Sequence, residues 1–452
     1  MFLGDIIAAI STPPGRGGIG VVRLSGPTAL EIAAAIFQAE SQIPVGESAR
    51  ARFGRLVDPK TGEHLDQAIL TYFKAPHSYT GEDVVELSCH GSPIVVSRIL
   101  DLIVQSGCRL AEPGEFTYRA FLNRRIDLAQ ALAVRDLIDA QTRYQGRVAA
   151  RQLEGALSKR LVRIRDLVVE VIVHLESSVE FAEDDLSTET ESVMLSKINR
   201  AVADLSEITA SFSFGRLVKE GFALAIVGRP NVGKSSVFNR LAGSDRAIVT
   251  EIAGTTRDAL YESTSIAGLP VRLIDTAGIR ETSDVVETIG ISRSRSAIAD
   301  ADMVLLVIDA SEPLTEDDAR LFEQVSGERR IIAMNKTDLP RAAELPAEEA
   351  ICISALTGEG FDELTATILR RLSGEAVIER DDLMITDARQ HNAVRRSIEQ
   401  LQGARELMVQ GEFEEVILLR MRGALDAIGE VTGETLTDDI LNQIFSTFCI
   451  GK

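Results

Sequence analysis

Hydrophobic and polar positions follow different patterns in successive zones of the chain. Residues 1 to about 120 contain short apolar runs separated by Gly and Pro, a pattern typical of strands and turns in an α/β domain. The first run contains Asp5 and lacks a basic leader, so we predict a strand there and no signal peptide. From about 121 to 215 Gly and Pro are scarce. One apolar stripe in this zone predicts a single helix face: Leu153, Leu157, Leu161, Ile164, Val168, Val171 and Leu175.

Residues from about 220 to 375 alternate apolar, strand-like runs with helical stretches. The runs are FALAIVG, VRLIDTAG, DMVLLVIDA, RIIAMNK and AICISA. This alternation predicts a mostly parallel sheet covered by helices, with the functional site at the carboxyl ends of the strands. Helical periodicity returns after about 380. We therefore expect the two helical zones to pack together and the α/β unit to be an insertion between them, since the ends of a domain often lie close in space.

Length and composition are consistent with several domains in a cytoplasmic protein. The chain has 452 residues, more than one domain usually holds. No apolar run reaches the roughly 18 residues of a membrane span. The four cysteines lie far apart, with no spacing typical of zinc or redox sites, so we expect reduced thiols. They are Cys89, Cys108, Cys352 and Cys449.

The charge distribution leaves two interpretations of one segment open. The net charge of −20 argues against broad, nonspecific nucleic-acid binding, which needs a basic surface. From Arg109 to Arg165, however, there are 12 Lys and Arg but only 6 Asp and Glu. This excess is either a solvated helix face or a docking surface for RNA phosphates.

A phosphate-binding loop stands at the start of the third zone. Residues Gly228–Ser235 have the pattern G-x-x-x-x-G-K-S, directly after a predicted strand and before a predicted helix. The glycines let backbone N–H groups turn toward the phosphates, and Lys234 adds a positive charge on the β and γ phosphates. Ser235 offers a hydroxyl to Mg²⁺, and the helix N-terminus favours the anion further.

Three more segments, in order, complete a guanine-nucleotide site. Asp275–Gly278 ends a predicted strand, so Asp275 is expected to reach Mg²⁺ and the Gly278 N–H to meet the γ-phosphate. In Asn335–Asp338, the Asp338 carboxylate can accept hydrogen bonds from the N1–H and 2-amino group of guanine, which adenine lacks. Lys336 is expected to lie over the base, and the segment from Ser354 to Leu356 to offer a backbone N–H to guanine O6.

The loop between the first two motifs predicts a sensor of the nucleotide state. It runs from Thr250 to Asp258, and either Thr255 or Thr256 is placed to complete the Mg²⁺ shell. Ile279 follows the second motif at a position where many small GTPases have a Gln that orients the attacking water. Isoleucine cannot do so. From the residues alone, either hydrolysis is slow or another polar residue substitutes. The acidic side chains Glu281, Asp284 and Glu287 are the candidates, and each is otherwise a solvated loop charge.

Together these segments resemble the TrmE (MnmE) family of tRNA-modification GTPases. The resemblance is carried by GRPNVGKSS, IAGTTRD, DTAGIRETSDVVE, NKTD and the terminal FSTFCIGK, and also by Ser11–Gly18, GEDVVELSCHG and PGEFTYRAFLN. It covers the full length. It implies a multidomain α/β plus α fold, with an N-terminal folate-binding and dimerisation domain over 1–120. It also implies a helical domain over 121–217 and 377–452, with a G domain inserted over 218–376.

The resemblance also implies how GTP is bound and hydrolysed. Pairing of two G domains depends on K⁺, which is held by Asn231, Thr250, Ile252 and Thr255. Ser235 and Thr256 hold Mg²⁺, and Glu287 is the catalytic residue, acting through a water. The complete implied set of GTP-binding residues is Asn231, Val232, Gly233, Lys234, Ser235, Ser236, Thr250, Glu251, Ile252, Ala253, Gly254, Thr255, Thr256, Asp275, Thr276, Ala277, Gly278, Asn335, Lys336, Asp338, Ser354 and Ala355.

The remaining implications concern the modification reaction. The family forms homodimers and acts with the FAD-containing protein MnmG to add a carboxymethylaminomethyl-type group to the wobble uridine of certain tRNAs. A reduced folate, 5-formyl- or methylene-tetrahydrofolate, is expected to contact Arg23, Glu86, Arg125 and Lys452. The family commonly has Lys at the position of Arg125, and the two side chains differ in hydrogen-bond geometry. Cys449 is either a functional thiol or a buried small hydrophobe.

Two other classes of function compete with this one. A ribosome-assembly or RNA-binding GTPase switch is expected to carry a C-terminal RNA module with a G-x-x-G loop between strands, whereas the tail here has a helical pattern. A membrane-remodelling GTPase is expected to carry a basic amphipathic or apolar anchor, and the sequence contains none.

Overall fold

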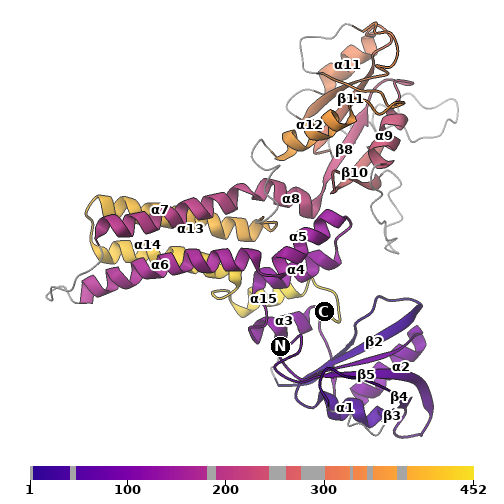
Figure 1. Cartoon of the computed structure of the whole chain (residues 1–452), viewed down its shortest axis with the longest axis vertical. Helices are drawn as coiled ribbons and strands as arrows, with labels where there is room; N and C mark the ends of the chain where they lie inside the picture. The colour runs from indigo at the N-terminus through magenta and orange to yellow at the C-terminus, as the bar shows by residue number, and fades with distance from the viewer. Residues whose placement is uncertain are drawn as a thin grey trace. The chain divides into compact units, whose positions relative to one another are not determined.

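The computed structural model describes residues 4–40, 47–180, 190–243, 261–275, 301–325, 329–343, 350–373 and 384–452. Their contacts divide the chain into two compact units (Figure 1). The first comprises residues 1–135 and 432–452, and the second comprises residues 136–431. The predicted domain boundaries near 120, 217 and 376 stay a prediction. Among the described helices, none is long and apolar enough to cross a membrane.

The first unit is built on a seven-stranded sheet with the order β3-β4-β5-β6-β2-β1-β7. All neighbours are antiparallel except β1 and β7, which run parallel. Alternating burial along β4 shows why such strands form: every second side chain faces the core. The strands are β1 (Ile7–Ile10), β2 (Gly17–Ser25), β3 (Phe37–Ala39), β4 (Ala51–Val57), β5 (His64–Phe73), β6 (Val84–Gly91) and β7 (Arg109–Leu110). The strand predicted in the first apolar run is β1.

Helices of the first unit come from both ends of the chain. α1 (Ala29–Ile36) and α2 (Pro93–Gln105) bury Ile36, Ile99 and Ile103 against the sheet. Helix α15 (Asp438–Phe445) packs with α3 (Glu115–Leu122) and with the first part of α4 (Leu128–Ile138). There the rings of Tyr118 and Phe445 lie edge to face, with 5.0 Å between their centroids. The last residues of the chain are therefore a structural part of this unit.

The second sheet carries the predicted nucleotide motifs. Its order is β13-β12-β11-β8-β10-β9, and all neighbours are parallel except β9 and β10. This confirms the mostly parallel sheet. The strands are β8 (Phe222–Val227), β9 (Tyr261–Ile266), β10 (Leu269–Asp275), β11 (Met303–Asp309), β12 (Arg330–Asn335) and β13 (Ala350–Cys352).

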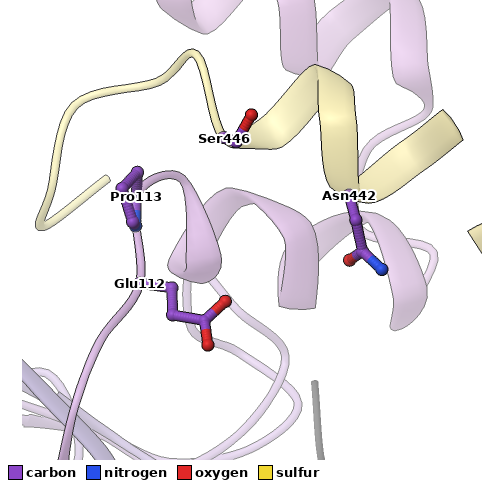
Figure 2. Close-up of a pocket in the computed structure, with 4 residues that line it drawn as sticks. All are labelled: Glu112, Pro113, Asn442 and Ser446. Carbon is purple, nitrogen blue, oxygen red and sulfur yellow. The ribbon is translucent and has the colours of Figure 1, made fainter. Parts of the chain in front are cut away.

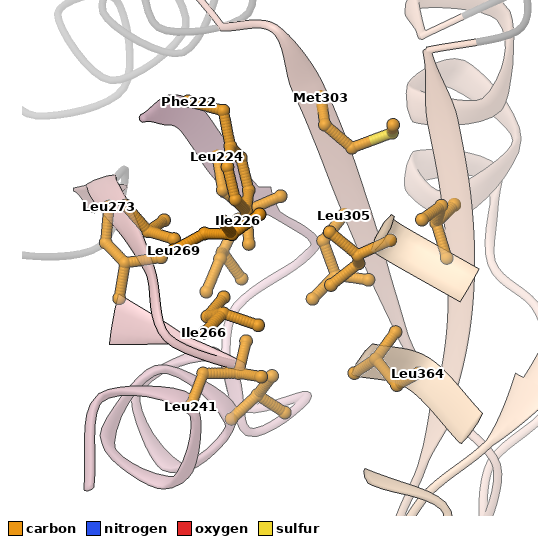
Figure 3. Packing of buried hydrophobic residues seen from close by; sticks show 14 of the residues in the cluster. Phe222, Leu224, Ile226, Leu241, Ile266, Leu269, Leu273, Met303, Leu305 and Leu364 are labelled. Atoms are coloured by element: carbon orange, nitrogen blue, oxygen red, sulfur yellow. The ribbon is translucent and has the colours of Figure 1, made fainter. Parts of the chain in front are cut away.

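Three helices cover this sheet and close its apolar core. They are α9 (Lys234–Gly243), α11 (Glu316–Gln324) and α12 (Phe361–Ser373). Figure 3 shows one face of the sheet, where Leu224, Ile226 and Leu305 pack against Leu241 of α9 and Leu364 of α12. Burying so many aliphatic side chains, each contributing about 1.5–3 kcal/mol, stabilises the packing of α9 and α12 on the sheet.

The remaining helices come from the segments that precede and follow the second sheet in the sequence, and they pack together. They are α5 (Arg143–Leu153), α6 (Ala156–Glu180), α7 (Glu191–Ala210), α8 (Phe212–Glu220), α13 (Ala388–Val409) and α14 (Glu414–Thr432). α13 lies along α7, and α7 along α6 (Figure 1). Arg422 of α14 pairs with Glu176 of α6 at 2.6 Å.

The apolar stripe predicted as one helix belongs to two. Leu157, Leu161, Ile164, Val168, Val171 and Leu175 are buried along α6, as the spacing predicts. Leu153, however, is the last residue of α5. Gly155 has a φ of 80°, a left-handed conformation that ends a right-handed helix. The prediction of one continuous helix was wrong because its period was read across this break.

Candidate nucleotide site and a second polar cluster

The loop after β8 has the shape that phosphate binding requires. It leads directly into α9, whose first residue is Lys234. Asn231 and Gly233 have φ values of 66° and 92°, so the backbone turns tightly here. A Cβ atom on Gly233 would lie 2.3 Å from the Asn335 side-chain nitrogen, and only glycine fits without displacing it. Lys234 Nζ donates to the Arg229 carbonyl at 2.8 Å, which keeps its positive charge over the loop.

Asn335 joins this loop to the segment predicted to read the base. Its side chain is buried at the end of β12. Asn335 Nδ2 donates to the Val232 carbonyl at 2.8 Å, and Asn335 Oδ1 accepts from the Ala355 N–H at 2.9 Å. The sequence placed Asn335 in the site through its motif, and the structure adds that it bridges two loops from different strands.

Asp338 and Ser354 also meet as the motif order predicts. Ser354 is fully buried, and its hydroxyl donates to Asp338 Oδ1 at 2.6 Å. The Thr357 N–H donates to the same hydroxyl oxygen at 3.1 Å. The Thr357 N–H thus holds the Ser354 hydroxyl, which in turn orients the exposed carboxylate of Asp338.

Lys336 has a buried carboxylate partner that the sequence analysis missed. Lys336 has a φ of 66°, and its Nζ lies 2.5 Å from Asp309 Oδ2. Burial by itself raises the pKa of Asp309, but hydrogen bonds from Lys336 and Ser311 outweigh it and lower that pKa. Asp309 is the last residue of β11, and its place at the end of a predicted strand was the only signal available in the sequence.

Several predicted nucleotide residues lie outside the described part of the chain. Asp275 is the last residue of β10. The predictions for Thr250–Thr256, for Thr276–Gly278, for Ile279 and for Glu287 all fall on residues beyond the described ranges. Among the residues described, no cluster of three or more His, Cys, Asp or Glu is arranged to hold a metal.

A second polar cluster joins Arg23 in β2 to the end of the chain. Arg23 Nη2 lies 2.7 Å from Glu86 Oε1, across neighbouring strands β2 and β6. Arg23 Nη1 donates to the Gly451 carbonyl at 3.2 Å, and the Ser11 hydroxyl donates to the same oxygen at 3.1 Å. The Arg23 guanidinium lies 5.8 Å from the ring of Tyr79 and 5.7 Å from a second aromatic ring, that of Phe116. Neither aromatic was predicted.

Of the four predicted folate contacts, the structure brings three together. Lys452 is half-buried, and burial, followed by the charge of Arg23, lowers its pKa, while Glu86 opposes this shift. Arg125 is exposed, and its side chain lies beside Gly81, where a Cβ atom would be 3.3 Å from Arg125 Cγ. No contact between Arg125 and the other three is among those described.

Cys449 is exposed, so its interpretation as a buried small hydrophobe was wrong. Its carbonyl accepts from the Gly114 N–H at 3.2 Å, which ties the tail to the turn before α3. Next to this turn is a pocket of about 340 Å³, shown in Figure 2. It is lined by Glu112, Pro113, Asn442 and Ser446.

Two residues of the basic segment form ion pairs within the protein, one of them buried and the other partly exposed. Arg119 is buried and pairs with Glu115 at 3.0 Å, with Glu82 at 3.2 Å and with Asp5. Arg109 pairs with Glu115 at 2.6 Å. These two arginines are therefore structural, and any RNA-docking surface in this segment depends on its other basic residues.

Known protein families and relatives match nearly the whole length of the chain. Residues 128–449 match the family described as the MnmE helical domain, and residues 6–125 match the GTP-binding protein TrmE N-terminus. The tRNA modification GTPase MnmE of Koribacter versatilis is 49% identical, covering 100% of both chains. Those of Aquifex aeolicus and Geobacter sulfurreducens are 45% and 44% identical and cover 99% and 100% of both chains, respectively.

Proposed function

We propose how this chain, which belongs to the MnmE (TrmE) family of tRNA-modification GTPases, binds and uses its nucleotide. GTP lies along the carboxyl ends of β8 and β12, with its phosphates on the loop before Lys234 and its base against Asp338. The observation that carries this assignment is the pair of hydrogen bonds made by the Asn335 side chain, which joins the phosphate loop to the Ala355 segment. The two halves of a nucleotide site are thus one connected structure.

For the phosphates, we infer that Lys234 leaves the Arg229 carbonyl and pairs with the β and γ phosphates. Ser235 in the first turn of α9 and Thr256 are the Mg²⁺ ligands, because Mg²⁺ prefers oxygen donors. Asn231, Thr250, Ile252 and Thr255 hold K⁺, which supplies positive charge where negative charge develops on the phosphates. Hydrolysis measured in K⁺ and in Na⁺ at equal ionic strength tests the K⁺ assignment, and equal rates would contradict it.

Glu287 is our candidate for orienting the attacking water. Positioning provides much of the catalysis in phosphoryl transfer, and Ile279 cannot provide it. We predict that Glu287→Ala lowers the hydrolysis rate by at least ~10²-fold while leaving GTP affinity nearly unchanged. Glu281→Ala and Asp284→Ala are the matched controls. A similar loss in either control, or normal turnover in Glu287→Ala, would show that the assignment is wrong.

The second polar cluster is proposed as the site of a reduced folate. In this proposal Arg23 and Arg125 pair with the glutamate carboxylates of the folate, Glu86 accepts from the donors of the pterin, and Lys452 adds positive charge. The support is the joint position of Arg23, Glu86 and Lys452 beside the Gly451 carbonyl. Calorimetry with 5-formyl-tetrahydrofolate tests this proposal. The wild type should release heat on binding, and Arg23→Ala should show no heat of binding.

In the reaction as a whole, we propose that a homodimer of this chain acts with the FAD-containing partner MnmG. The product is a carboxymethylaminomethyl-type group on the wobble uridine of certain tRNAs. The competing RNA-binding switch is not favoured, because the described residues 384–452 form the helices α13, α14 and α15. Mass spectrometry of tRNA nucleosides tests the proposal in cells that lack this protein. The modified uridine should disappear, return with the wild-type chain and stay absent with Lys234→Ala.

A further inference from the structure

Arg240 connects the phosphate-binding helix to the segment that faces the base. It lies in α9, six residues after Lys234. Arg240 Nε donates to the Ala355 carbonyl at 2.8 Å, and Arg240 Nη2 donates to the Leu356 carbonyl at 2.8 Å. A guanidinium that bonds two consecutive carbonyls restrains both peptide units, because its donors form a rigid planar fork.

The surroundings of Arg240 are shaped to receive the guanidinium. A Cβ atom on Gly358 would lie 2.5 Å from Arg240 Nη1, so glycine at this position leaves the necessary space. The guanidinium carbon lies 5.8 Å from the ring centre of Phe361, within the range of a cation–π contact. Asn335 holds the same segment from the other side, through the Ala355 N–H. The segment 355–358 is thus clamped between a buried amide and a surface guanidinium.

The exposure of Arg240 separates this role from simple packing. Its side chain is exposed and borders an open groove of about 920 Å³. The groove is also lined by Ser236 and Asn239 of α9 and by Asp362 and Thr365 of α12. Because an exposed arginine contributes little to core burial, its two hydrogen bonds act mainly on the position of the loop that they restrain.

We propose that Arg240 is a positioning residue for guanine recognition, which holds the segment 355–358 against the base. This inference rests on the proposed placement of the base beside Ala355 and Asp338. Arg240 itself touches no nucleotide atom in this account. Its loss frees the segment to move, so the base is released faster, whereas the phosphate loop in front of Lys234 is unaffected.

The test uses the full chain loaded with a fluorescent GDP and chased with excess unlabelled GDP. Arg240→Ala should release the nucleotide about tenfold faster than the wild type, the effect of losing roughly 1–1.5 kcal/mol of hydrogen bonding. Arg240→Lys should be intermediate, because a lysine reaches one carbonyl but cannot fork across two. Asn239→Ala is the matched control on the same helix and groove, and should release at the wild-type rate.

A second measurement distinguishes positioning of the base from damage to α9. Inorganic pyrophosphate, which has no base, is used to displace fluorescent GDP from each variant. The competition curve gives the dissociation constant of pyrophosphate. That constant should be equal in the wild type and Arg240→Ala. Wild-type GDP release in Arg240→Ala, or an equal loss of pyrophosphate binding, would overturn the inference. Failure of the wild type to bind GDP would instead contradict the proposed function itself.

Discussion

The nucleotide site and the Arg23 cluster are built in opposite ways. The first draws on short motifs, each at the end of a neighbouring strand, and Asn335 ties two of them together. The second depends on a contact between Arg23 and Gly451, which are 428 positions apart. A site made of local motifs is fixed by the geometry of one sheet. A site that uses a chain end depends on how firmly that end is held.

Matched glycine substitutions, one in each site, provide the sharpest test of this difference. Gly233→Ala places a Cβ atom 2.3 Å from the side-chain nitrogen of Asn335, which is buried and donates to the Val232 carbonyl. We predict a loss of GTP affinity of ~10³-fold, equivalent to a strain of about 4 kcal/mol. Folate binding should stay within twofold of the wild type. Calorimetry with both ligands measures this, and a parallel loss of folate binding would show that the two sites are not separate.

Gly451→Ala is the corresponding change in the second site. Its Cβ atom would lie 2.5 Å from the Ile10 carbonyl, so the tail must move away from β1. When the Gly451 carbonyl moves with the tail, Arg23 loses a charge-assisted acceptor. We predict a loss of folate affinity of about 30-fold with unchanged GTP affinity. Unchanged folate binding would mean that the Gly451 carbonyl does not organise the site.

A smaller effect is expected from acid, acting in the first unit through Glu115. For Glu115, burial raises the pKa, but hydrogen bonds from Arg109, the Glu112 N–H and Arg119 lower it overall. A carboxyl group with a lowered pKa stabilises the folded state above its unfolded pKa, and this contribution is lost as the pH falls through the folded value. Between pH 6 and pH 3, hydrogen exchange of the amides in α3 should accelerate by about fivefold relative to α9. In Glu115→Gln this extra acceleration should be smaller, and the part that remains is due to Asp5, whose pKa burial raises but hydrogen bonds from Arg109 and Arg119 lower overall.

The same contrast explains what the sequence could predict. Local patterns predict the strands, the mostly parallel sheet and the site residues Lys234, Asn335, Asp338 and Ser354. The reason is that the strand ends and the order of the motifs determine which residues come into contact. Asp309 and Arg240 could not be found in this way. Each acts through a partner on another element, and an Asp at a strand end or an Arg on a helix is too common to indicate a role.

The second cluster shows a different limit. Arg23, Glu86 and Lys452 were identified by resemblance alone, and Tyr79 and Phe116 were missed, since no local period connects β2, α3 and the chain end. The break at Gly155 is a third case. A stripe of correct spacing does not reveal that the helix ends within it. Long-range packing and single left-handed residues are thus the information that patterns omit.

We propose that guanine is selected by the Asp338 carboxylate, to which the Ser354 hydroxyl donates. The most direct measurement is a comparison of GTP and xanthosine triphosphate binding by the wild type and Asp338→Asn in calorimetry. An Asn side chain presents a donor where Asp only accepts, so the ratio of the two affinities should shift toward xanthosine triphosphate by at least ~10³-fold. An unchanged affinity for GTP in Asp338→Asn would contradict the account.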